Sequence, residues 1–106
     1  MIAGFVVRYT DGARADLLRL FDFLLNRAQT AENFDDAQST VNAIQASVQG
    51  HLSRTPFSYR KAGASPFLRE LAIPLRAGGC VVLYEIEGGS VASILAVRHQ
   101  HEDDYL

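Results

Sequence analysis

The chain has 106 residues, of which 48% are hydrophobic and 21% are charged, and its formal net charge is −2. This length allows one domain with one core, which we assign to residues 1–106. The composition excludes an intrinsically disordered chain, because such chains combine low hydrophobicity with high net charge. It also lacks the overall basic excess that is typical of proteins that bind nucleic acid.

The sequence predicts a soluble, cytoplasmic protein that does not enter a membrane. Its first residues lack the basic start and long apolar stretch of a signal peptide. The longest apolar runs, Cys80–Tyr84 and Val91–Val97, are much shorter than the roughly 20 residues that cross a bilayer. Cys80 is the only cysteine. Its apolar neighbours predict a core residue rather than a reactive thiol.

The N-terminal part of the chain predicts a strand and then a helix. Phe5–Tyr9 alternates apolar residues with Arg8, as a half-buried strand requires. Thr10 and Asp11 offer N-cap side chains, and apolar residues at helical spacing predict a helix over Gly12–Arg27.

A second helix is predicted after the short connection Gln29–Glu32. Asn33, Asp35 and Asp36 supply a cap and negative charge at its start, and its apolar stripe continues to about Gly50. Two helices joined by so few residues are expected to lie antiparallel.

The C-terminal half predicts a loop followed by three strands. His51–Pro66 is irregular, although Phe57–Arg60 can pair briefly. The predicted strands are Phe67–Ile73, Cys80–Ile86 and Val91–Val97, joined by the Gly-containing turns Ala77–Gly79 and Gly88–Ser90. The fold class is therefore α+β: an N-terminal strand and an antiparallel helical hairpin packed on a mostly antiparallel sheet with a C-terminal three-strand meander.

Three motifs carry a resemblance that extends from Phe5 to Tyr105. They are Ala13-x-x-Asp16-Leu17 in the first helix, Leu68-Arg69-Glu70-Leu71 in the meander, and Ile94–Gln100 with Glu102 and Tyr105 after it. Together they resemble the RelE/ParE superfamily of bacterial toxins. The closing segment is the most specific, and it resembles the ParE-like branch, often called plasmid-stabilisation toxins. Where that branch commonly has an Arg, this chain has His101, which argues against a cationic tail.

The resemblance implies a type II toxin–antitoxin system, in which a cognate antitoxin binds the toxin with a helix or an extended tail. A hydrophobic groove or an unpaired edge strand would suit such a partner. Phe23 and Leu25 lie off the main apolar stripe of the first helix. They are either exposed anchors for the partner or, as is commoner for single apolar residues, part of the core. A homodimer is left open.

The superfamily contains two mechanisms: ribosome-dependent mRNA cleavage, as in RelE-like members, and inhibition of DNA gyrase, as in ParE-like members. Cleavage of RNA needs groups that transfer protons and cations that stabilise the phosphorane charge. For a nuclease, the candidate catalytic residues are Arg60, Arg69, His99 and Tyr105.

The ParE-like closing segment, together with the lack of positive charge, favours the gyrase inhibitor, which the resemblance implies causes growth arrest without being an enzyme. The Lys/Arg clustering of the nucleases is absent, and Glu102–Asp104 would repel phosphate. The expected target-binding residues are Arg60, Arg69, Arg98 and His99. A non-toxic remnant that only binds antitoxin is the remaining alternative.

Purely structural roles are open for the same residues. Arg69 can pair with Glu70 or Glu85, and His99 can cap the final strand. A metal site from His99, His101, Asp103 and Asp104 is not favoured, because this spacing is common by chance. We expect no cofactor.

Overall fold

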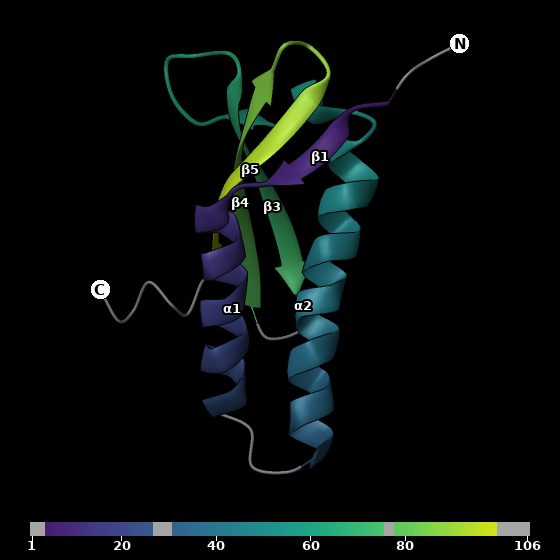
Figure 1. Ribbon diagram of the computed structural model, residues 1–106, viewed down its shortest axis with the longest axis vertical. Coiled ribbons are helices and arrows are strands. Elements are labelled where there is room, and N and C mark those ends of the chain that lie inside the picture. Colours follow the sequence, from purple (N-terminus) through teal and green to yellow (C-terminus); the bar gives the residue numbers. More distant parts are fainter. Residues whose placement is uncertain (1–3, 27–30, 76–77, 100–106) are drawn as a thin grey trace.

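A computed structural model describes residues 4–26, 31–75 and 78–99 of the chain. Its elements in chain order are β1 (Val6–Tyr9), α1 (Asp11–Asn26), α2 (Ala31–Leu52), the 3₁₀ turn η1 (Pro56–Ser58), β2 (Arg60–Lys61), β3 (Leu68–Leu75), β4 (Gly78–Glu87) and β5 (Val91–His99). The two helices run side by side in front of the sheet (Figure 1). The predicted α+β class and helical hairpin are confirmed.

The sheet has five strands in the order β1-β5-β4-β3-β2. Strands β3, β4 and β5 form the predicted antiparallel meander. Strand β1 joins it at the far side and runs parallel to β5, with Tyr9 opposite Ile94. Parallel strands need a long crossover connection. Here that connection begins with the two helices, which lead the chain from β1 to β2 at the opposite edge of the sheet.

Both helices begin slightly earlier than the sequence predicts. Thr10 caps α1, since the Ala13 N–H donates to its hydroxyl oxygen at 3.2 Å. Helix α2 already begins at Ala31, so the predicted connection Gln29–Glu32 is partly helical and Asn33 lies inside the first turn. Neither helix, in its described part, is apolar over a length that could cross a membrane.

The two turns of the meander differ from each other. Gly88 and Gly89 form the predicted tight turn with φ angles of 59° and 77°, values that residues with a Cβ rarely adopt. In the other hairpin the expected turn Ala77–Gly79 is wrong, because Gly78 and Gly79 already belong to β4 and pair with Leu75 and Pro74.

The predicted loop after the second helix is more ordered than its sequence suggests. It contains the last residues of α2, the turn η1 and the short strand β2. Brief pairing does occur, but at Arg60–Lys61, which lies opposite Arg69 and Glu70 of β3.

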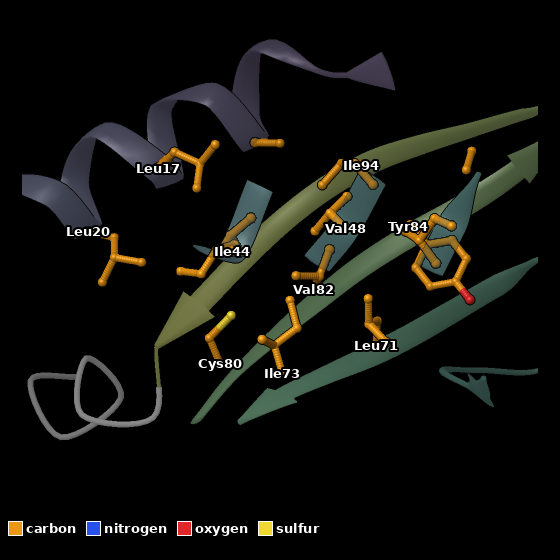
Figure 2. Close-up of a cluster of buried hydrophobic side chains, with 14 of the residues drawn as sticks. Leu17, Leu20, Ile44, Val48, Leu71, Ile73, Cys80, Val82, Tyr84 and Ile94 are labelled. Carbon is orange, nitrogen blue, oxygen red and sulfur yellow. The ribbon is translucent and has the colours of Figure 1, made fainter. Parts of the chain in front are cut away.

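The hydrophobic core lies between the helices and one face of the sheet. Leu17 and Leu20 of α1 meet Ile44 and Val48 of α2 above Val82 (Figure 2). Burial of each such side chain contributes roughly 1.5–3 kcal/mol. Cys80 is also buried here, as predicted. No described helix covers the opposite face of the sheet, which we call the open face.

Candidate target-binding site

Helix α1 completes the outer edge of β5 where β1 ends. The Thr10 hydroxyl donates to the Ile94 carbonyl oxygen at 2.7 Å, just after the last β1 pair. Further along, the Val97 N–H donates to the Asp16 carboxylate at 2.8 Å. Asp16 therefore occupies a position where a sixth strand would otherwise pair. The first family-like motif thus has a structural explanation that the sequence alone does not provide.

The same carboxylate lies beside two arginines. Asp16 is 8% exposed, and its oxygen is 2.6 Å from the Arg19 guanidinium and 3.7 Å from that of Arg98. A nearly buried carboxylate needs such partners, because burial without them would cost several kcal/mol. Arg98 remains about half exposed. Its guanidinium is therefore oriented by Asp16 and is still accessible to a partner.

Arg98 borders a hollow on the open face of the sheet. The hollow has a volume of about 600 Å³ and an apolar floor, and it is lined by outward-facing residues that include Glu70, Ala72, Pro74, Val81 and Arg98. Glu70, another lining residue, makes a 2.5 Å ion pair with Arg60 of β2. Arg60 lies opposite Glu70 in the sheet, so it shares the open face with Arg98.

Arg69, by contrast, is bound to the protein's own backbone. Its guanidinium donates to the carbonyl oxygens of Pro66 at 2.8 Å, Phe57 at 3.0 Å and Tyr59 at 2.8 Å. It also lies 5.4 Å from the centre of the Phe57 ring. The structural alternative of pairing with Glu70 is not what the structure shows, since Glu70 binds Arg60. Arg69 instead fixes the loop before β3.

Tyr84 is a second anchor of that loop, and the sequence analysis did not identify it. Its buried hydroxyl donates to the Pro56 carbonyl oxygen at 2.5 Å. Burial raises the pKa of Tyr84 to about 12, while Arg69 lowers it and Tyr59 raises it further. The apolar alternation of β4 indicates that this residue faces the core, but not that it reaches a carbonyl 28 residues earlier.

His99 lies inside the protein rather than on its surface. It is 1% exposed at the end of β5, and its ring centre is 6.1 Å from that of Phe23. Phe23 is half-buried against the core, as in the commoner of its two predicted roles, and Leu25 is also half-buried. Direct contact between His99 and a partner is not possible in this conformation.

The remaining predicted residues lie outside the described part of the chain. These are Tyr105 of the nuclease set and His101, Asp103 and Asp104 of the metal set. Within residues 4–26, 31–75 and 78–99, no group of three or more His, Cys, Asp or Glu side chains could hold a metal ion.

Solved structures of toxins from toxin–antitoxin systems are similar to this chain. One, described as the chromosomal ParDE system of P. aeruginosa, has a TM-score of 0.70 and 18% identity, covering 90% of this chain and 95% of that one. The RelBE2 complex of Mycobacterium tuberculosis has a TM-score of 0.60 and 21% identity, covering 94% and 95%. A mutant of E. coli toxin RelE in the free state has a TM-score of 0.58 and 13% identity, covering 98% and 92%. At these identities, they establish the fold.

The sequence comparison identifies the family. No curated protein sequence matches the chain. The family described as the ParE toxin of the type II toxin–antitoxin system parDE, however, matches residues 7–104, nearly the whole chain. The predicted RelE/ParE resemblance is therefore confirmed, and this chain belongs to the ParE toxin family of type II toxin–antitoxin systems.

Proposed function

We propose that this toxin acts by binding DNA gyrase, without cutting RNA, and that a cognate antitoxin neutralises it. A system of this kind would stabilise the replicon that carries its genes, since loss of the antitoxin leads to growth arrest. The gyrase target comes from the ParE-like resemblance of the sequence. The observation that carries the non-enzymatic mechanism is the position of Arg69, whose guanidinium is bound to three backbone carbonyls.

The nuclease alternative needs cations and proton-transfer groups that reach one phosphate together. Arg69 is bound to three backbone carbonyls, Arg60 is paired with Glu70, and His99 is 1% exposed. Tyr105, the fourth member of that set, lies outside the described residues. This arrangement favours a toxin that contacts a protein target over one that performs phosphoryl chemistry.

For the target contact we propose the open face of the meander, with Arg60 and Arg98 as the direct contacts. Both guanidinium groups are accessible there. Arg98 lines the apolar hollow, and Arg60 is paired with Glu70, which also lines it. Aromatic and Arg side chains around an apolar centre are typical of protein interfaces. Arg69 and His99 would then act only indirectly, by holding the loop and the end of β5 in place.

Incubation of the purified toxin with gyrase, supercoiled plasmid and ATP tests this proposal. We expect linear plasmid, released by detergent from cleaved gyrase–DNA complexes, in an amount that rises with toxin concentration and falls when antitoxin is added. The variant Arg98→Ala should reduce the yield, while the matched surface variant Arg14→Ala on α1 should not.

Two other results would contradict the proposal. Absence of cleaved complexes at saturating toxin, together with codon-dependent cleavage of mRNA on ribosomes, would establish the nuclease. Absence of both activities in a protein that still binds antitoxin would identify a non-toxic remnant.

A further inference from the structure

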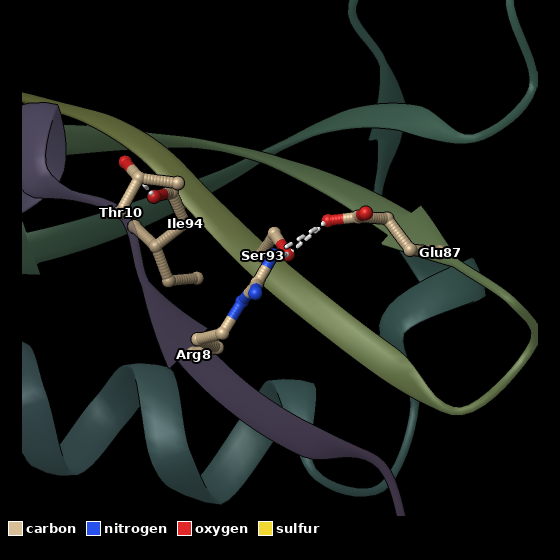
Figure 3. A network of polar contacts seen from close by, with 5 residues as sticks. All are labelled: Arg8, Thr10, Glu87, Ser93 and Ile94. Atoms are coloured by element: carbon tan, nitrogen blue, oxygen red, sulfur yellow. Dashed lines mark hydrogen bonds and ion pairs between the residues drawn. The ribbon is translucent and has the colours of Figure 1, made fainter.

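Two arginines of the open face are bound to carboxylates of the same face. Arg8 of β1 donates to Glu87 at 3.3 Å and to the Ser93 hydroxyl at 3.1 Å (Figure 3). Arg60 of β2 donates twice to one oxygen of Glu70, from Nε at 3.1 Å and from Nη2 at 2.5 Å. Each arginine therefore has a carboxylate partner, and each pair has no net charge.

Arg98 of β5 is held differently. Its guanidinium is 3.7 Å from the Asp16 carboxylate, close enough for attraction between the charges but too far for a hydrogen bond. The nearest Asp16 oxygen is 2.6 Å from Arg19, and the other oxygen accepts from the Val97 N–H. Among the residues that the structure describes, none accepts a hydrogen bond from the Arg98 guanidinium. Asp16 thus orients Arg98 and leaves its donors to a partner.

The hollow beside Arg98 has a floor of small or compact residues from neighbouring strands. Ala72 of β3 lies opposite Val81 of β4, which in turn lies opposite Arg98. In the next outward-facing row, Pro74 lies opposite Gly79. Because neighbouring strands are about 4.8 Å apart, the backbones of Ala72 and Arg98 are about 10 Å apart. This width and the volume of about 600 Å³ leave room for an apolar side chain of a partner.

The charges around the hollow specify the chemistry of that partner. Glu70 also lines the hollow, but Arg60 already neutralises its carboxylate. A basic group would therefore have to displace Arg60, whereas a carboxylate can accept directly from Arg98. A nucleic-acid backbone fits less well, because it is bound by several cations together, and Arg98 is the one cation among the described lining residues.

We infer that the hollow binds an acidic and apolar segment of the target, with a carboxylate on Arg98 and an adjacent apolar side chain on the floor. The inference rests on the proposed function, in which gyrase contacts the open face. The apolar contact would exclude water from the carboxylate–guanidinium pair and thereby strengthen it. Asp16 is then a positioning residue, since it holds Arg98 at the rim without occupying its donors.

A single charge change on the lining tests the sign of the partner's charge. Glu70→Gln removes a negative charge and releases Arg60, so it should strengthen binding of the toxin to immobilised gyrase about threefold, as measured by surface plasmon resonance. A basic group of the target on Glu70 would instead make the same variant bind more weakly. Asp11→Asn, at an exposed position of α1, changes the net charge equally and should not alter the affinity.

Two changes of Arg98 test the contact with the carboxylate. Arg98→Gln removes the charge but keeps N–H donors, and should weaken gyrase binding about tenfold. Arg98→Glu opposes two carboxylates and should weaken it further. Arg14→Glu makes the same change in net charge on an exposed part of α1 and is the matched control. Circular dichroism and thermal melting establish that each variant is folded.

A third variant fills the floor of the hollow. Ala72 is exposed, so Ala72→Leu adds a side chain to the hollow without entering the core. It should weaken gyrase binding about tenfold, because it occupies the place of the apolar side chain. Ala46 is exposed on α2, and Ala46→Leu makes the same addition away from the open face.

The outcomes separate this inference from the proposed function. Stronger binding by Glu70→Gln, with weaker binding by Arg98→Gln and Ala72→Leu, supports it. Glu70→Gln that binds no better than wild type, or Arg98→Glu that binds as well as Arg14→Glu, overturns the acidic partner while wild-type binding leaves the gyrase target standing. Ala72→Leu that binds as well as Ala46→Leu overturns the apolar contact. Wild-type toxin that does not bind gyrase overturns both proposals.

Discussion

The start of β3 and the end of β5 each contain an arginine that the sequence predicts to bind the target, and the two side chains behave differently. Arg69 is surrounded by backbone carbonyls and donates to three of them. Within the described residues, the carboxylate next to Arg98 is that of Asp16, at 3.7 Å, and Arg98 is about half exposed. An arginine that donates to three carbonyls of an irregular segment holds that segment in place and is part of the fold, because hydrogen bonds from a charged donor are stronger than neutral ones. An arginine anchored at one point remains available to a partner.

The largest expected difference between the two regions is in stability. Arg69→Ala should lower the free energy of unfolding by about 3 kcal/mol, because it leaves several loop carbonyls without a donor. Urea denaturation of Arg69→Ala and Arg98→Ala measures the free energy of unfolding of each variant. Equal losses in the two variants would contradict the different roles of the two arginines.

Asp16 holds the end of β5, next to Arg98, through its hydrogen bond with Val97. Asp16→Ala should cost about 2 kcal/mol, because the buried Val97 N–H loses its acceptor. Asp16→Asn keeps an oxygen at that position and should cost less. If both variants unfold at the same urea concentration as wild type, the hydrogen bond does not stabilise this edge.

Tyr84 holds the same loop as Arg69, through its hydrogen bond to Pro56. Tyr84→Phe should cost about 1 kcal/mol at neutral pH, since the Pro56 carbonyl loses its donor. The pKa of Tyr84 is raised from 10.0 to about 12, so the folded state favours the neutral phenol. Its contribution is complete below pH 10 and is lost as the pH rises toward 12. Alkaline unfolding should therefore be shallower in the Phe variant than in wild type; identical curves would contradict this role.

The smallest expected change in stability belongs to the residue assigned to the target. Arg98→Ala should alter the free energy of unfolding by less than about 0.5 kcal/mol, as is usual at exposed positions. It should nevertheless reduce cleaved gyrase complexes, because the guanidinium on the rim of the hollow is lost. A folded variant with undiminished activity would remove Arg98 from the contact.

Much of the fold follows from local sequence. Alternation of apolar residues and the Gly88-Gly89 turn identify the meander, and the apolar stripes identify both helices. The sequence did not predict the parallel pairing of β1 with β5, because it joins residues that lie 85 positions apart. Local patterns contain no direct information about such partners.

The site was less predictable for a related reason. The sequence identifies Arg69 and His99 as chemically capable residues, but their roles depend on which backbone groups and side chains surround them. Arg69 reaches carbonyls of the preceding loop, and His99 packs near Phe23 of α1. Asp16 was noted only as part of a motif, and its partner Val97 lies 81 residues away.

Induced expression of this chain alone in a bacterial culture tests the central claim most directly, with DNA-damage response and mRNA half-life followed in parallel. Gyrase binding predicts growth arrest with a DNA-damage response and intact mRNA, reversed by co-expression of the antitoxin. Arrest with cleaved mRNA and no DNA damage would contradict it.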